Sequence, residues 1–131
     1  YAIDIRPRNR HWEKVRKFEY KFLNIFNKEI EELIQQYDNV ILTSSHPCGN
    51  LAVRTIELFE NFEQVKHLFL MPCCQGKIKE SYLTLPSLVM DKLTSYEKWC
   101  LYLQQMAGYS KLTRDEHVMS SKNCIISSGA T

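Results

Sequence analysis

The sequence predicts an α/β fold built around a mainly parallel β-sheet. Segments with the two-residue alternation of strands follow one another along the chain, separated by segments with the three-to-four-residue spacing of helices. Residues 40–43 are apolar at successive positions and rich in β-branched side chains, as expected of a parallel strand that is buried on both faces. Such alternation over 131 residues is typical of βαβ units, and we expect residues 1–131 to form a single, partial domain.

The individual elements follow from this periodicity together with helix caps. Asn27 and Asn50 are suitable N-caps, and Thr94 is expected to cap a third helix that ends at Gly108. Mixed signals in residues 75–93 indicate a long loop with a short helix inside it. The predicted strands cover residues 1–5, 20–24, 40–43, 65–71 and 123–127, and the predicted helices cover residues 10–18, 28–37, 51–59 and 95–107.

Composition excludes several classes of protein. The chain is 44% hydrophobic and 24% charged, which is ordinary for a globular domain and argues against disorder. No apolar run approaches the roughly 20 residues that a membrane-spanning helix needs, and Asp4 and Arg6 argue against a signal peptide. The first residue is Tyr1 rather than Met, so we expect a piece of a longer polypeptide or a processed product.

The cysteines indicate a reducing environment. Their number is odd, their spacing lacks the regularity of a disulfide scaffold, and two of them are adjacent, which is a poor geometry for bridging to each other. We therefore expect reduced thiols and an intracellular location, cytoplasmic or nuclear. The five cysteines are Cys48, Cys73, Cys74, Cys100 and Cys124.

Charge is concentrated near the start of the chain. The formal net charge is only +2, but residues 1–21 hold seven basic and three acidic side chains, which gives +4 for that segment. A basic patch from Arg6 to Lys21 is suited to phosphate groups such as those of RNA. A solvated helix face followed by a loop is the alternative interpretation of the same residues.

Ligands of parallel α/β sheets bind at the carboxyl ends of the strands. In this sequence that rule directs attention to Asp4, residues 24–27, residues 44–50 and residues 72–76. A carboxylate after a strand, such as Asp4, can accept hydrogen bonds from the two hydroxyls of a ribose, although turns also use Asp freely.

Two of these turns carry a distinctive pattern. The letters HPCGNLA occupy residues 46–52 after one predicted strand, and MPCCQ occupies residues 71–75 after the next. They resemble a branch of the class I S-adenosylmethionine-dependent methyltransferases. That branch has a His-x-Cys-Gly-Asp/Asn-Leu-like turn after its fourth strand and a Pro-Cys-Cys-His/Gln turn after its fifth. The branch includes methyltransferase-like proteins and is similar to a tRNA ribose methyltransferase group.

The resemblance implies a Rossmann-like methyltransferase fold, S-adenosyl-L-methionine as cofactor, and an acceptor that is RNA, such as tRNA. It covers most of the chain, with residues 1–4 as the second strand, 20–27 as the third strand and its loop, and 122–127 as a late strand. By likeness His46 and Asn50 are the catalytic residues, with His46 as base or acceptor-orienting group. The implied cofactor-binding residues are Asp4, Ile5, Leu23, Asn24, Ser45 and His46, and the implied substrate-binding residues are Pro72, Cys73, Cys74 and Gln75.

The sequence departs from the family at one important place. The glycines at positions 49, 76, 108 and 129 form no Gly-x-Gly-x-x-Gly loop, and the family's first strand has no counterpart. That strand lies in the middle of the family's sheet, so its loss would leave two unpaired edges. We expect a fold that is incomplete at its N-terminal side, with the missing central strand supplied by upstream sequence or a partner chain, and weak cofactor binding by these residues alone.

Three alternatives remain open at this point. The chain could be a non-catalytic methyltransferase-like interaction module, which the absent glycine loop favours. His46, Cys48, Cys73 and Cys74 could converge on a metal, although adjacent cysteine ligands are unusual. Cys48, near His46 and a helix start, could be a nucleophile, or it could simply pack in a tight turn.

Overall fold

The computed structural model describes residues 1–4, 19–73, 75–78, 85–108 and 110–129. The predicted helix over residues 10–18 lies outside these ranges, as do most residues of the basic segment. The described elements, in chain order, are β1 (Ala2–Asp4), β2 (Tyr20–Phe22), α1 (Lys28–Gln35), β3 (Val40–Ser45), α2 (Asn50–Asn61), β4 (Val65–Met71), α3 (Ser87–Met90), α4 (Ser95–Met106), β5 (Lys111–Arg114) and β6 (Cys124–Gly129).

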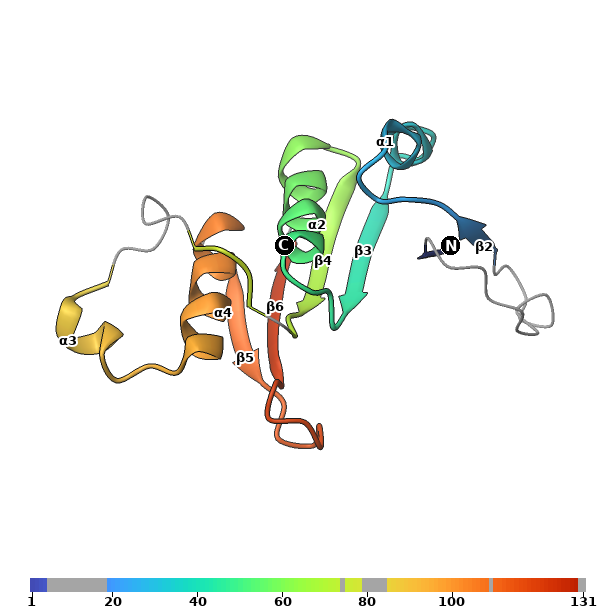
Figure 1. Cartoon of the computed structure of the whole chain (residues 1–131). Helices are drawn as coiled ribbons and strands as arrows, with labels where there is room; N and C mark the ends of the chain where they lie inside the picture. The colour runs from blue at the N-terminus through green and yellow to red at the C-terminus, as the bar shows by residue number, and fades with distance from the viewer. Residues whose placement is uncertain (5–18, 74, 79–84, 109, 130–131) are drawn as a thin grey trace.

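The strands form two sheets (Figure 1). β1 and β2 pair in parallel, and a separate four-stranded sheet has the order β3-β4-β6-β5. In that larger sheet only the β3–β4 pairing is parallel, whereas β6 runs antiparallel to both β4 and β5. The α/β class is confirmed, but the prediction of a mainly parallel sheet is wrong. The physical reason is one reversed strand, β6, which lies between β4 and β5 and turns two of the three pairings antiparallel.

The larger core lies between this sheet and the helices α2 and α4. Both helices pack on the same face, and their apolar side chains meet Leu68 and Leu70 of β4 and Ile126 of β6, which are fully buried. Trp99 of α4 lies at the centre and stacks on Tyr102 with ring centroids 5.3 Å apart. Burying such side chains contributes about 1.5–3 kcal/mol each, so this cluster is a main source of stability.

The opposite face of the sheet differs from the prediction. Successive side chains of β3 alternate between half-buried and exposed, and Ile41 is 61% exposed. Phe69 of β4 points to the same side and is 46% exposed. The expectation that residues 40–43 are buried on both faces is therefore wrong within the described residues, because the described helices α2 and α4 cover one face.

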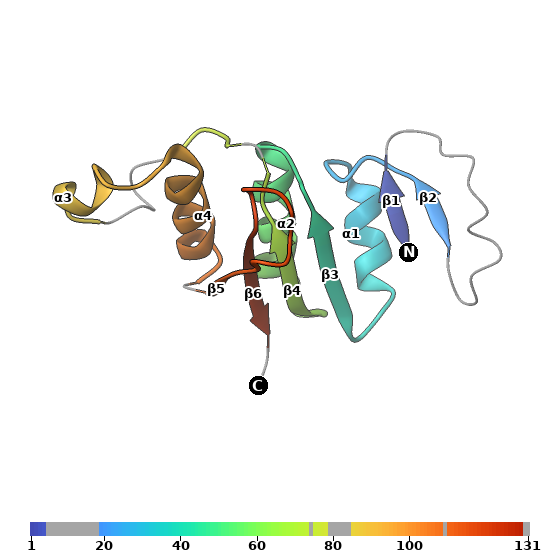
Figure 2. The same cartoon turned by 90° about the horizontal axis from the view of Figure 1, so that it is seen from below.

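A second core cluster joins the two sheets. Ile30 and Ile34 of α1 pack with Leu58 of α2 and Val65 of β4, and Ile3 of β1 lies against this cluster. The helix α1 therefore holds β1 beside the larger sheet, as Figure 2 shows. In that view the arrowheads of β1, β2 and β3 point to the same side of the molecule.

Most predicted elements appear, with shifted ends. Asn27 and Thr94 occupy the N-cap positions of α1 and α4, as predicted, and Thr94 forms a complete capping box with Glu97. Gly108 follows α4 with φ of +67°, a conformation that suits glycine. Asn50 is not the cap of α2, since Gly49 holds that position and Asn50 is the first helical residue.

Candidate functional site

The two distinctive turns lie side by side. β3 and β4 are parallel neighbours, and Ser45 at the end of one pairs with Met71 at the end of the other. The pairing continues one residue further, because the main-chain N–H of His46 donates to the Met71 carbonyl at 2.9 Å. The turn that starts at His46 and the turn that starts at Pro72 therefore leave the sheet together.

The same two turns touch again at their glycines. A Cβ atom added to Gly76 would stand 3.1 Å from Cα of Gly49 and 2.8 Å from Cη2 of Trp99. Gly49 itself has φ of +47°, which side-chain-bearing residues rarely adopt. Both positions therefore require glycine, Gly49 for its backbone conformation and Gly76 for its close contacts.

His46 occupies an unusual backbone conformation. Its φ of +54° makes it the non-glycine residue with positive φ among the described positions. Such conformations cost about 1–3 kcal/mol and cluster at functional sites. The side chain is exposed at the end of β3, next to exposed Ser45, so its imidazole is accessible to an incoming molecule.

Asn50 begins α2 and lines a hollow of about 410 Å³ between α2 and α4. Lys77, two residues after Gln75, lines the same hollow, so a residue of the first motif and a residue just after the second both border it. Tyr102 and Met106 of α4 form its apolar wall.

The turn after β2 is closed by local hydrogen bonds. The Oδ1 atom of Asn24 accepts the main-chain N–H of Phe26 at 2.9 Å, and the Asn24 carbonyl accepts the N–H of Asn27 at 3.0 Å. The side chain of Asn24 is half-buried, and that of Phe26 is exposed. Leu23 is 8% exposed and belongs to the second core cluster. Asn24 is therefore the more accessible of the two predicted adenine neighbours.

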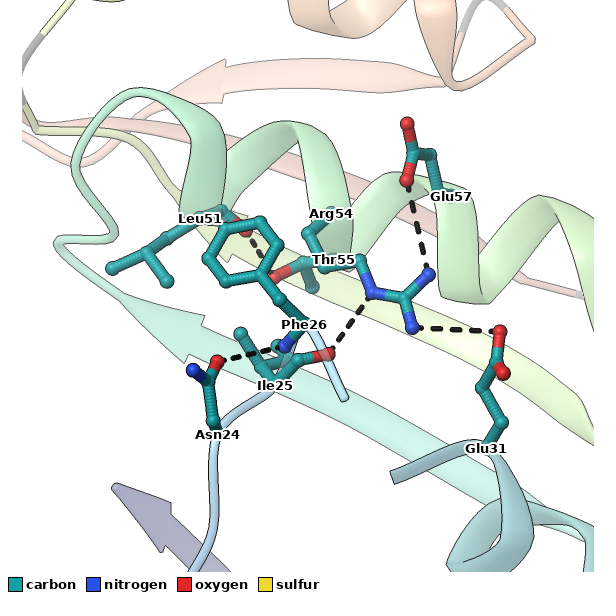
Figure 3. A network of polar contacts seen from close by, with 8 residues as sticks. All are labelled: Asn24, Ile25, Phe26, Glu31, Leu51, Arg54, Thr55 and Glu57. Atoms are coloured by element: carbon teal, nitrogen blue, oxygen red, sulfur yellow. Dashed lines mark hydrogen bonds and ion pairs between the residues drawn. The ribbon is translucent and has the colours of Figure 1, made fainter. Parts of the chain in front are cut away.

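Arg54 of α2, which belongs to no recognisable sequence motif, contacts this turn. The Nε atom of Arg54 donates to the Ile25 carbonyl at 2.9 Å, as Figure 3 shows. The same guanidinium pairs with Glu31 of α1 at 3.4 Å and with Glu57 of α2 at 3.8 Å. Its sequence signal is weak, because a lone arginine in an amphipathic helix is usually a solvated surface residue.

The turn after β4 is anchored by Tyr96 of α4. Its hydroxyl donates to the Pro72 carbonyl at 3.0 Å and accepts the main-chain N–H of Cys124 at 3.2 Å. Burial raises the pKa of the Tyr96 hydroxyl well above its usual value of 10.0. The phenol therefore stays protonated and ties the turn to both α4 and β6.

The remaining predicted site residues are placed as follows. Asp4 ends β1, and Cys73 and Gln75 lie in the turn after β4, the first half-buried and the second exposed. Ile5 and Cys74 lie outside the described residues, so their predicted roles stay predictions. Among the described positions there is no cluster of three or more His, Cys, Asp or Glu side chains that could hold a metal ion. No helix in the described part of the chain is long and apolar enough to cross a bilayer.

Comparison with known proteins gives the family. A family model described as a methyltransferase domain matches residues 1–81. The chain belongs to the methyltransferase domain family. The matched methyltransferase segment contains Asp4, the Asn24 turn and both touching turns, whereas α4, β5 and β6 follow it in the chain.

A human relative supports the same assignment. The chain is 24% identical over 83 residues to the probable methyltransferase-like protein 25 of Homo sapiens, which covers 60% of this chain. The chain spans only 13% of the length of that relative. No solved structure matches this methyltransferase domain significantly.

Proposed function

We propose that this methyltransferase domain transfers a methyl group from S-adenosyl-L-methionine to a hydroxyl of RNA, with tRNA as the favoured acceptor. The observation that carries the proposal is the contact between the His46 and Pro72 turns inside the methyltransferase match. These are the turns whose residues resemble the class I branch that is similar to tRNA ribose methyltransferases.

The described residues are chemically suited to this cofactor, which supplies an activated methyl group on a positively charged sulfur. An acid ends β1, a half-buried amide begins the turn after β2, and the ends of β1, β2 and β3 point to one side of the molecule (Figure 2). Asp4 would bind the ribose hydroxyls, with Ile5 beside it, and Asn24 with Leu23 would border the adenine. Ser45 and His46 would border the methionine part.

The acceptor side is proposed to lie between the two touching turns. His46 would take the proton of the acceptor hydroxyl, since its side chain is exposed and within reach of solvent, and Asn50 would orient the acceptor. Cys73, Cys74 and Gln75 would form the facing wall, with the fully buried Pro72 behind them. Positioning accounts for much of the rate in such a displacement, so the close approach of Gly49 and Gly76, which brings the two turns together, favours this role.

We also propose that a further strand completes the sheet between β1 and β3. Among the described residues β1 pairs with β2 alone and β3 pairs with β4 alone, so each has an edge without a strand partner. α1 holds both strands against one core cluster. A strand from elsewhere in a longer polypeptide, or from a partner chain, would satisfy both edges and bring the glycine-rich loop.

The acceptor class rests on charge as well as on resemblance. The segment from Arg6 to Lys21 would contact RNA phosphates. Lys21, its described end, pairs with Glu19 at 3.5 Å and lies 5.2 Å from the ring centroid of Tyr1. RNA binding through this segment should weaken steeply with added salt.

The test uses the longest natural polypeptide that contains this domain. Calorimetry should detect S-adenosyl-L-methionine binding, and Asp4→Ala should weaken that binding by about tenfold or more, since a charged hydrogen bond contributes about 1.5–3 kcal/mol. Asp38→Ala is the matched control, because Asp38 is an exposed acid in the loop before β3. His46→Ala should lower methyl transfer by about 10²–10⁴-fold, while weakening donor binding less than Asp4→Ala does. Absence of binding heat in the unaltered protein contradicts the catalytic proposal.

A second function has one observation in its favour. The sequence contains no Gly-x-Gly pair, which the family uses near the methionine part of the cofactor. A longer polypeptide that also lacks this loop would favour a non-catalytic interaction module with the same fold. Partner capture that survives Asp4→Ala and His46→Ala, without donor binding, would identify it.

A further inference from the structure

We infer that Arg54 is a positioning residue. It fixes the turn after β2 (residues 23–27), on the proposed nucleoside side, relative to the methyl-transfer turn, which starts at His46. The inference rests on the proposed function, and nothing in the family match assigns a role to this residue. The guanidinium of Arg54 contacts three parts of the chain (Figure 3).

The contacts of Arg54 cross three elements. Its Nε–H donates to the carbonyl of Ile25 at 2.9 Å, in the turn that follows β2. Its Nη2 atom lies 3.4 Å from Glu31 of α1, and its Nη1 atom lies 3.8 Å from Glu57 one helical turn along α2. A planar guanidinium can serve several acceptors at once in a fixed arrangement, whereas an ammonium group cannot do so in the same way.

Burial makes these contacts effective. The side chain of Arg54 is 14% exposed and that of Glu31 is 31% exposed, whereas Glu57 is 51% exposed. Hydrogen bonds to a charged group are stronger than neutral ones, and they are screened less when they are shielded from water. The contacts of Arg54 with Ile25 and Glu31 are therefore the stronger ones, and its ion pair with Glu57 is the weaker one.

The Arg54 contact differs from the other described hydrogen bonds of this turn, which are local. The Asn24 side chain is committed to the N–H of Phe26, and the Asn24 carbonyl to the N–H of Asn27. These bonds set the internal shape of the turn. Leu23 and Ile25 pack against the second core cluster, and the Arg54–Ile25 bond adds a directional tie from the turn to α2.

The same helix carries the methyl-transfer turn. α2 begins at Asn50, directly after the turn that starts at His46, and Arg54 lies about one helical turn further along. Arg54 therefore connects the adenine side of the proposed site with the helix that fixes the other side. Losing it should change donor binding without removing any group that touches the donor.

The test is Arg54→Met in the longest natural polypeptide, a change that keeps an aliphatic stem and removes the guanidinium. We expect S-adenosyl-L-methionine binding to weaken about tenfold, from the loss of a charge-assisted hydrogen bond. The KM for the acceptor should stay unchanged, and kcat at saturating donor should stay within about twofold. Hydrogen exchange of residues 24–27 should accelerate, whereas exchange in β4 should not.

Two further variants keep the result interpretable. Arg54→Lys should recover part of the donor affinity, because it retains the charge but not the fork geometry. Glu57→Gln is the control, because it removes only the weak, exposed ion pair with Arg54 and should leave donor affinity unchanged. If Arg54→Met does not fold, Arg54→Lys and Glu31→Gln replace it in the test. Each should weaken donor binding about threefold, because each loses only part of the free energy of one charged hydrogen bond.

The outcomes separate the two proposals. If the unaltered protein binds the donor and Arg54→Met binds it equally well, the positioning role is overturned and the proposed function stays intact. Unchanged affinity in both Arg54→Lys and Glu31→Gln has the same meaning. No donor binding by the unaltered protein contradicts the proposed function and removes the basis of the positioning role. Equal loss in Glu57→Gln and Arg54→Met would also overturn the inference, since it would indicate a general charge effect of α2.

Discussion

Gly49 and Gly76 lie in direct backbone contact, so that a Cβ atom on Gly76 would stand 3.1 Å from Cα of Gly49. The two residues belong to turns that follow different strands, so the two turns approach each other closely at this point. The indole of Trp99 closes the remaining space, with its Cη2 atom 2.8 Å from the same Cβ position.

Gly76→Ala is therefore expected to destabilise the domain by about 1–3 kcal/mol, the usual cost of overpacking. Urea denaturation measures this difference. In a Trp99→Phe background, which lacks Cη2, the penalty of Gly76→Ala should be smaller, and the double-mutant cycle gives the coupling. Equal penalties in both backgrounds would show that Trp99 does not restrict this position.

The capping box of α4 gives a pH-dependent prediction. The Thr94 main-chain N–H donates to Glu97 at 3.1 Å, and this bond lowers the pKa of the Glu97 carboxyl below its usual 4.5. A lowered pKa in the folded state gives stability that is present above pH 4.5 and is lost as the pH falls through the folded-state pKa. Glu97→Gln should therefore remove part of the acid sensitivity measured by urea unfolding between pH 7 and pH 3, and an unchanged pH profile would contradict this assignment.

Thr94→Ala tests the same box from its other side. The Thr94 hydroxyl accepts the main-chain N–H of Glu97 at 3.1 Å, so its removal should cost about 1 kcal/mol. Ser95→Ala is the matched control, since Ser95 is exposed at the first helical position and should change stability by less than about 0.5 kcal/mol. Thermal unfolding of the two variants measures the difference.

The buried thiol of Cys100 gives a prediction at alkaline pH. Burial raises the pKa of Cys100 from its usual 9.0 to about 12. A raised pKa in the folded state gives stability that is complete below pH 9.0 and declines as the pH rises toward about 12. Cys100→Ala should reduce the alkaline loss of stability relative to the unaltered chain.

Thiol labelling provides an independent measurement of the same burial. At pH 8 a disulfide reagent should modify exposed Cys48 well before Cys100, which is 1% exposed. Cys100 should react only after denaturant is added. Rapid labelling of Cys100 in the folded protein would contradict its place in the core.

Leu68 and Phe69 are neighbours in β4 that face opposite sides of the sheet. Leu68→Ala should cost about 2–5 kcal/mol, because it opens a cavity in the fully buried core. Phe69→Ala should cost about 1 kcal/mol or less, because the ring is 46% exposed. Denaturant unfolding of both variants compares the two faces directly. Equal costs would contradict the exposure of Phe69.

The sequence predicted the order of elements well where local patterns determine them. Residues 65–71 form a strand with the predicted ends, and Thr94 and Gly108 delimit α4 because capping depends on neighbouring residues. The strand over Lys111–Arg114 was not predicted, because four residues that are mostly polar carry no clear alternation. The reversed direction of β6 was also missed, since periodicity does not reveal how a strand pairs.

The candidate site was predicted in part. The two motifs follow consecutive predicted strands of one sheet, and the structure shows that the turns starting at His46 and Pro72 are neighbours. The anchoring roles of Arg54 and Tyr96 were not predicted, because they depend on contacts across 29 and 24 residues of sequence. The catalytic, cofactor-binding and substrate-binding roles of all the predicted site residues stay predictions.

The place of β6 in the sheet has a consequence for synthesis of the chain. β5 precedes β6 in sequence, yet it reaches β4 only across β6. During translation β5 therefore has no strand to pair with in the described sheet until Cys124–Gly129 has left the ribosome. In a nascent chain stalled before Cys124, β4 would lack its neighbour β6, and β5, although already synthesised, would have no strand to join in the described sheet.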